Sequence, residues 1–238
     1  MPFLRITTLI AGLFSMTLSA GSIELQGHRG ARGVLPENSI PGFQHAIAAG
    51  SDCLELDIAM TRDGRIVITH DPVFSPDLVR KDGVWIVDPP PIKALTYADL
   101  KAYDVGRLRP GSTYARRFPK QQPIDGLPIP LLTDLFALPD ARDNESLCFD
   151  IEIKTSPASA DLTFSPAKIA DRLIQVIDES GLRKRSRIRS FDWRGLVHVR
   201  QKAPDIPLAF LSAERPWLDN LQVGQKGKSP WLAGIDID

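Results

Sequence analysis

The feature that most limits the possible folds is an alternation of short apolar segments with longer amphipathic ones. The apolar segments are typical of strands and lie at 23–28, 53–58, 65–70, 147–153, 187–191 and 207–211. Helices are expected at 39–49, 166–180 and 193–202. A strand–helix–strand order over most of a chain favours a parallel α/β sheet or barrel, and we predict an α/β fold of the TIM-barrel type. One step is an exception: Asp63-Gly64 indicates a tight turn where a crossover helix is expected.

The alternation breaks down between Asp71 and Pro130. Ten prolines lie in this stretch, with only one short helical pattern near 97–103. Irregular segments of this length are uncommon in compact domains unless they are functional. We therefore predict that residues 72–130 form a Pro-rich insertion, which lies over the face where the third strand ends.

The two ends of the chain carry separate expectations. Residues 6–20 form an uncharged apolar run followed by small residues, which predicts a signal peptide over 1–21 rather than an anchor or a buried first helix. The protein is then periplasmic or secreted, without stable membrane insertion after signal removal. The remaining residues, 22–238, are few for a barrel, which typically needs about 250. With six strands counted, we expect a C-terminally incomplete barrel that lacks the last one or two β/α units and exposes two strand edges.

Composition excludes several classes of function. The 29 basic and 29 acidic residues cancel, so no overall basic field favours nucleic acid as a partner. Two cysteines are too few for a disulfide framework or a Cys-rich zinc module. Cys53 and Cys148 share strand parity with Glu55 and Glu152, and we expect two buried thiols there. Pairing is the alternative in an oxidising compartment.

Carboxylates occupy strand positions where apolar residues are expected. In LELDI, Glu55 and Asp57 share one face because strand side chains alternate with period 2, and Glu152 repeats the device in IEIK. Buried carboxylates on one face repel one another unless a positive charge lies between them. A hard divalent cation held by these three side chains satisfies that requirement. Ordinary surface alternation on an edge strand is the competing interpretation, but the apolar residues in between also need burial.

Two histidines follow strands that are expected to end at the same face. His28 lies in GHRG and His70 in HDP, and the C-terminal ends of barrel strands converge on one site. Such a pair suits general acid and base catalysis near neutral pH. Arg29 beside His28 suits an anionic group such as phosphate. His45 and His198, in predicted helices, receive a structural interpretation.

These motifs resemble the glycerophosphodiester phosphodiesterase family. The matching segments run from about residue 23 to the C-terminal region and read GHRGARGVLPENSIPGFQHAIAAG, DCLELDIAMTRDGRIVITHDP, FDIEIKT and SFDW. The resemblance implies a barrel that binds Ca²⁺ or Mg²⁺ and cleaves a glycerophosphodiester to glycerol 3-phosphate and an alcohol. It also implies the site residues: metal ligands Glu55, Asp57 and Glu152, catalytic His28 and His70, and substrate-binding Arg29, Lys154 and Asn38.

Some alternatives remain open at this stage. Asn38 lies in the Pro-Glu-Asn element as a site-shaping residue, or else Asn38 or Ser39 caps the following helix. The basic residues at 184–189 are expected to form a solvated surface. A phospholipase D-like or phosphoinositide-cleaving barrel enzyme is one alternative function, and a non-catalytic exported binding protein on a decayed barrel is another.

Overall fold

The computed structural model describes residues 23–235. The segment predicted as a signal peptide lies outside the described residues. Among the described helices, none combines the length and apolar character that crossing a membrane requires.

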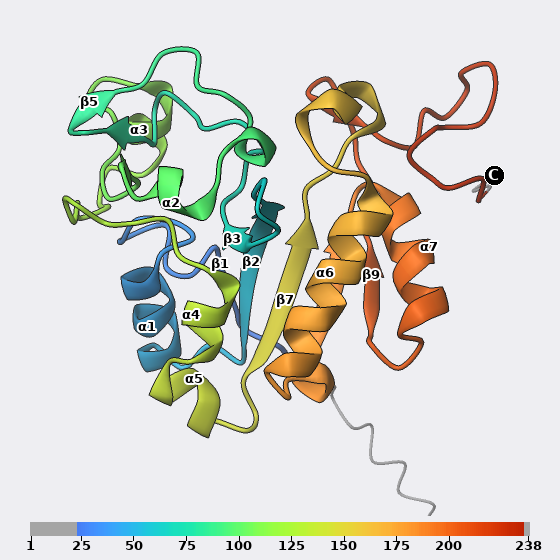
Figure 1. The fold of residues 1–238 in the computed structure, drawn as a ribbon, viewed down its shortest axis with the longest axis horizontal. Coiled ribbons are helices and arrows are strands. Elements are labelled where there is room, and N and C mark those ends of the chain that lie inside the picture. The colour runs from blue at the N-terminus through green and yellow to red at the C-terminus, as the bar shows by residue number, and fades with distance from the viewer. Residues whose placement is uncertain (1–22, 236–238) are drawn as a thin grey trace, which may run out of the picture.

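The main sheet contains five parallel strands. Figure 1 shows helices along this sheet, and they pack in one core on its apolar face. The parallel strands follow the order β1-β2-β7-β8-β9. Their bounds are Gln26–His28, Cys53–Met60, Cys148–Ile153, Ser186–Ser190 and Leu208–Phe210. The expected α/β architecture with a parallel sheet is thus confirmed, and all six predicted strands are present. In the part of the chain that the structure describes, β1 and β9 form two edges of an open sheet.

The sixth strand enters the sheet in the opposite direction. β3 (Ile66–Ile68) pairs with the end of β2 in an antiparallel hairpin, with Ile58 opposite Ile68. The tight turn at Asp63-Gly64 explains this, because two strands joined by a turn this short must run antiparallel. The predicted tight turn at Asp63-Gly64 is therefore confirmed, and β3 is not one of the parallel strands. The hairpin still returns the chain to the level of Asp57, whose carbonyl accepts a hydrogen bond from Thr69 N at 2.9 Å.

The helices cover the sheet with their apolar faces. α1 (Ile40–Ala48) begins at Ser39, whose side chain accepts a hydrogen bond from Gly42 N. α6 (Pro166–Glu179) and α7 (Trp193–Lys202) pack against each other, close to their predicted bounds. The main core joins these helices to the apolar residues of the sheet, such as Leu56 and Ile151, and to the short helices α4 (Leu132–Phe136) and α5 (Pro139–Asp143). Two 3₁₀ segments also occur: η2 (Pro157–Leu162), which is kinked at Ser159, and η3 (Arg183–Arg185).

Segment 72–130 has a folded structure of its own. It contains a three-stranded sheet, short helical turns and a second buried cluster that includes Phe74 and Tyr103. The elements are β4 (Arg80–Lys81), β5 (Val84–Trp85), η1 (Ile92–Ala94), α2 (Tyr97–Leu100), β6 (Tyr103–Asp104) and α3 (Thr113–Arg117). In Figure 1 the segment lies above β1, β2 and β3, at the end of the sheet to which β2 points. The sequence pattern indicated only one helical piece, because strands of two residues carry no readable period.

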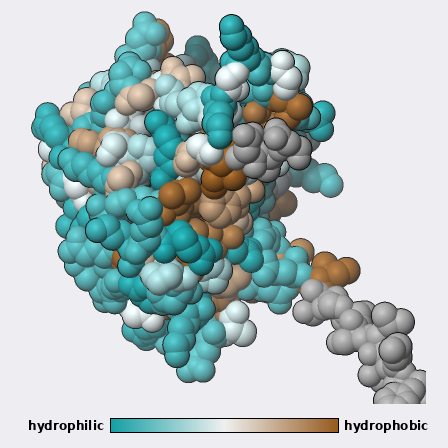
Figure 2. Space-filling view, turned by 90° about the vertical axis from the view of Figure 1, so that its right-hand side faces the viewer, coloured by the Kyte–Doolittle hydropathy of each residue, from teal (hydrophilic) through white to brown (hydrophobic). Residues whose placement is uncertain are grey.

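The last described element is a hairpin of β10 (Glu214–Arg215) and β11 (Leu218–Asp219). Figure 2 looks onto the side with β9 and α7 and shows hydrophobic side chains gathered in the middle of this face, surrounded by hydrophilic ones. Phe210 on β9 is 39% exposed. The sheet therefore offers some apolar surface along this edge.

Candidate active site

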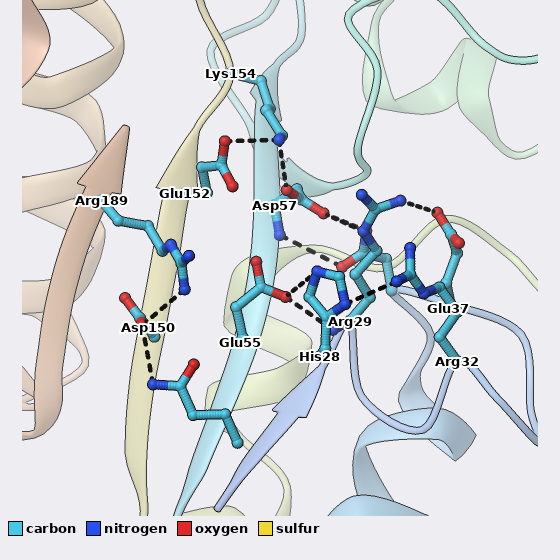
Figure 3. A network of polar contacts seen from close by, with 12 residues as sticks. His28, Arg29, Arg32, Glu37, Glu55, Asp57, Asp150, Glu152, Lys154 and Arg189 are labelled. Atoms are coloured by element: carbon cyan, nitrogen blue, oxygen red, sulfur yellow. Dashed lines mark hydrogen bonds and ion pairs between the residues drawn. The ribbon is translucent and has the colours of Figure 1, made fainter. Parts of the chain in front are cut away.

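The centre of the site is a ladder of paired polar residues on β2 and β7. The two strands are in parallel register, with Cys53 opposite Cys148, Glu55 opposite Asp150, and Asp57 opposite Glu152. All three pairs share one face because side chains alternate with period 2. Figure 3 shows the carboxylates of the two upper pairs between the neighbouring strands.

Three of these carboxylates form a group of the size that a cation requires. Glu55, Asp57 and Glu152 are buried, and each offers an oxygen within 4.8 Å of the others. Within the group, Lys154 Nζ lies 2.6 Å from Glu152 Oε1 and 3.1 Å from Asp57 Oδ1. An all-oxygen set is the chemistry that Ca²⁺ and Mg²⁺ prefer, so the residues present fit such an ion. The three predicted ligands are therefore brought together.

The electrostatics of the group show why it needs a positive charge. Burial and the nearby Asp57 raise the pKa of Glu55 to about 8. Burial also raises the pKa of Glu152, against the opposing effect of Lys154. Burial acts in the same direction on Asp57, but Lys154, His70 and Arg29 outweigh it and lower the pKa of Asp57 to about 2. Asp57 is therefore ionised at neutral pH, whereas Glu55 and Glu152 bind their protons more tightly than ordinary carboxylic acids do.

The fourth carboxylate of the ladder is neutralised by the protein itself. Asp150 is buried, and its Oδ2 lies 2.8 Å from Arg187 Nη2 and 3.0 Å from Arg189 Nη1. Both arginines come from β8, which pairs with β7. The expectation that residues 184–189 form a solvated surface was therefore wrong for these two. The alternation C-x-D-x-E at 148–152 repeats C-x-E-x-D at 53–57, and this parity was the signal that could have found Asp150.

The two predicted histidines line the same cleft but have different partners. His28 Nε2 lies 3.6 Å from Glu55 Oε2, and its Nδ1 accepts a hydrogen bond from Arg32 at 2.8 Å. Burial, together with Arg32 and Arg29, lowers the pKa of His28 to about 4, so that its ring is neutral at pH 7. His70 Nδ1 instead lies 2.7 Å from Asp71 Oδ1. Each ring is thus oriented through Nδ1.

The guanidinium group of Arg29 lies between two carboxylates, those of Glu37 and Asp57. Its Nη1 donates to Glu37 Oε1 at 2.8 Å, and its Nε lies 3.2 Å from Asp57 Oδ2. Arg29 has a φ of 54° and the next residue, Gly30, a φ of 76°. A Cβ on Gly30 would lie 2.8 Å from the backbone of Gly42, so this turn requires glycine.

Asn38 is a positioning residue for Asp57. Its side-chain amide donates to Asp57 Oδ2 at 3.0 Å, and it is buried with a φ of 51°, which asparagine tolerates better than most residues. Ser39, not Asn38, caps the N-terminus of α1. The interpretation of Asn38 as a site-shaping residue agrees with this arrangement.

Sequence reasoning missed Arg32 and Tyr114. The hydroxyl of Tyr114, on α3, donates to Glu37 and lies 3.4 Å from Arg29 Nη1. Tyr114 lies 82 residues from Arg32, and its Oη is 3.5 Å from Arg32 Nη1. Neither residue belongs to a strand or shows a local period, so the sequence gives no signal for them.

These groups line an open cleft of about 850 Å³ whose two walls differ in chemistry. One wall carries Arg29, Arg32, Tyr114 and Arg117. The other wall combines apolar side chains with hydroxyl groups: Leu162, Phe191, Trp217, Leu218 and Trp231 with Thr155, Ser156, Ser159 and Thr163. The cleft therefore offers a buried acidic floor, two imidazoles and a choice of polar or apolar surroundings.

The lowest pair of the ladder is a disulfide between Cys53 and Cys148. Direct pairing on adjacent strands places their Cα atoms 4.4 Å apart, close enough for the bond. The expectation of two buried thiols was therefore wrong. The sequence could not decide between the two states, because it does not show that the strands are neighbours in register.

Comparison with known proteins gives consistent results. The model of the glycerophosphoryl diester phosphodiesterase family matches residues 28–235. A glycerophosphodiester phosphodiesterase of Bacillus altitudinis is 27% identical over 213 residues, which is 88% of this chain and 76% of the relative. One from Caldanaerobacter subterraneus is 29% identical over 211 residues, with 87% and 75% covered.

Solved structures show the same fold. A protein from Silicibacter pomeroyi, described as a candidate glycerophosphoryl diester phosphodiesterase, superposes with a TM-score of 0.76 and 32% identity over 86% of this chain and 69% of that one. A phosphodiesterase of Oleispira antarctica, solved with the product sn-glycerol-3-phosphate, gives a TM-score of 0.59 with 21% identity over 82% and 69%. At that identity the second likeness concerns the fold alone.

Proposed function

This chain belongs to the glycerophosphoryl diester phosphodiesterase family, and from that premise we propose that it hydrolyses glycerophosphodiesters to glycerol 3-phosphate and an alcohol. One observation carries the proposal: the buried carboxylate group of Glu55, Asp57 and Glu152 opens into the cleft that His28 and His70 line. This combination supports cation binding beside a pair of groups that transfer protons.

Glu55, Asp57 and Glu152 would hold one divalent cation, Ca²⁺ or Mg²⁺. When bound, such an ion supplies Lewis-acid charge that stabilises the oxygens of a phosphodiester in the transition state. Asn38 fixes the Asp57 carboxylate, and Lys154 balances the charge between Asp57 and Glu152. Lys154 has three donor hydrogens and Arg29 five, so both retain donors for phosphate oxygens after meeting these carboxylates.

The two histidines divide the proton transfers. For this step Arg32 leaves His28 Nδ1, which then carries the hydrogen of the neutral ring, and Nε2 takes the proton of the glycerol 2-hydroxyl, whose oxygen bonds to phosphorus. As the bond from phosphorus to the head-group oxygen breaks, His70 gives that oxygen a proton, with Asp71 holding the ring through Nδ1. The product is a cyclic phosphate. Water then opens the ring with the two roles reversed, which yields glycerol 3-phosphate and restores both histidines.

The decisive experiment is hydrolysis of glycerophosphocholine with and without a chelator, coupled to detection of glycerol 3-phosphate. We expect release that stops with chelator and returns with added Ca²⁺ or Mg²⁺. Glu152→Gln should lose this release, whereas Asp171→Asn, in a surface pair with His198, should retain it. Release of phosphocholine instead would indicate another phosphodiesterase class, and no metal-dependent release at all would reject the proposal in favour of a binding protein.

We also propose that the protein works outside the cytoplasm. The apolar run at 6–20 supports export, and the Cys53–Cys148 disulfide suits an oxidising compartment. Fractionation of cells that express the full chain, followed by thiol labelling, tests this. Recovery of a fully reduced protein from the cytoplasmic fraction would contradict it.

A further inference from the structure

Two arginines at the mouth of the cleft are held in place by aromatic rings. Arg32 Cζ lies 4.8 Å from the ring centre of Phe118, and Arg117 Cζ lies 5.8 Å from the ring centres of both Tyr114 and Phe118. The two rings pack with their centres 5.2 Å apart. We call these four residues the arginine wall. Contacts between arginine and aromatic rings fix the side chain while leaving its N–H groups available.

The positive charge of the arginine wall is not balanced locally. Among the ion pairs of residues 23–235, none involves Arg32 or Arg117. The carboxylate beside the wall, Glu37, already accepts hydrogen bonds from Arg29 and Tyr114. Arg32 keeps donors beyond those directed at His28 and Tyr114, and Arg117 has no side-chain hydrogen bond or ion pair among the described residues. By contrast, Arg187 and Arg189 inside the sheet are both paired with Asp150.

The position of the wall separates it from the catalytic floor. Arg32 contacts His28 on the side of the ring opposite Glu55, because it binds Nδ1 while Nε2 lies nearest the carboxylate. Arg117 lies on α3, in segment 72–130, next to Tyr114, and is exposed. A group bound by Arg32 thus lies on the other side of the His28 ring from Glu55, and Arg117 lines the same cleft.

From this geometry we propose that the arginine wall binds a second anionic group, a phosphomonoester or a carboxylate, on the alcohol portion of the substrate. The inference rests on the proposed function and names its preferred substrates: glycerophosphodiesters with an anionic head group. A glycerophosphodiester carries one negative charge at the scissile phosphate, which the floor of the cleft meets. The planar forks of two arginines match a further phosphate or carboxylate.

Two substrates that differ by a single phosphomonoester test this directly. We expect kcat/KM for glycerophosphoinositol 4-phosphate to exceed that for glycerophosphoinositol by about tenfold, the effect of one charged hydrogen bond. The preference should weaken as salt is added, because the wall is partly exposed. Arg117→Ala should reduce the ratio of the two kcat/KM values towards one, and Arg117→Lys should restore part of it.

Arg116→Ala is the matched control, since Arg116 lies on the same helix but bonds to Gly111 O and Thr113 Oγ1. It should leave the ratio at its wild-type value. Equal cleavage of both substrates by the wild type would overturn the inference while the proposed function stands. An Arg117→Ala variant that loses both activities equally would overturn it too, because the residue would then serve packing. Cleavage of neither substrate in the presence of metal would reject the proposed function itself.

Discussion

The sheet and segment 72–130 present charged side chains to the cleft in opposite ways. On β2 and β7 four carboxylates are buried side by side, and each depends on a cation from the protein or the solvent. In segment 72–130 the charge that reaches the cleft is that of Arg117 on a short helix, which lies against the rings of Tyr114 and Phe118 instead of a carboxylate. The sheet therefore holds the carboxylates in a fixed geometry for catalysis, while the segment presents an exposed positive charge to the bound substrate. Changes in the sheet should act on turnover, and changes in the segment on substrate choice.

The largest effect is expected at His70. His70→Ala should lower kcat for glycerophosphocholine by about a thousandfold, because general acid catalysis is lost, and leave metal affinity nearly unchanged. A substrate with a 4-nitrophenol leaving group needs no protonation, so its single-turnover release of 4-nitrophenol should largely recover, while opening of the cyclic phosphate stays slow. His28→Ala should show no such recovery, and the exposed His45→Ala should behave as wild type. Equal recovery in both site variants would contradict the division of roles.

The next effect tests the positioning of a ligand. Asn38→Ala removes the hydrogen bond to Asp57 Oδ2 and should weaken Ca²⁺ or Mg²⁺ binding by about 10- to 100-fold, as measured by calorimetry. Asn144→Ala, whose side chain bonds only to Ser146 nearby, is the control. Unchanged metal affinity in Asn38→Ala would show that the sheet fixes Asp57 without help.

A smaller effect is expected where the two regions meet. Tyr114→Phe removes the hydroxyl that joins α3 to Glu37 and Arg29, at a cost of about 1 kcal/mol in the free energy of unfolding. We expect KM to rise a few-fold with kcat nearly constant, which steady-state kinetics would show. A fall in kcat alone would mean that the segment takes part in the chemistry, which would remove the distinction drawn above.

A last prediction concerns the pH dependence of stability in chelated protein. The raised pKa of Glu55 gives stability that is present below pH 4.5 and lost as pH rises towards 8. The lowered pKa of His28 acts oppositely, but only between about 4 and 6.5. Between pH 6.5 and 8, Tm should therefore fall with rising pH, and Glu55→Gln should flatten the curve. Saturating metal should reverse the trend, because it binds the ionised carboxylate.

Sequence reasoning found what depends on local parity and missed what depends on pairing. Glu55, Asp57 and Glu152 share a face by the period of a strand, which any reader of the sequence can count. The disulfide and the two arginines on Asp150 depend on which strands become neighbours. Tyr114 reaches Glu37 over 77 positions of the chain through a segment whose elements are too short to predict. Such contacts arise from tertiary packing alone.

The disulfide has a consequence for the topology of the chain. Cys53 and Cys148 are 95 positions apart, and the whole of segment 72–130 lies between them. In the oxidised protein this segment is a closed loop even after unfolding, which lowers the entropy of the unfolded chain by an amount worth about 4 to 5 kcal/mol at 25 °C. A protease that cuts once within the loop would leave two fragments still joined through β2 and β7. The strands that carry the carboxylates would stay attached to each other until a reductant separates them.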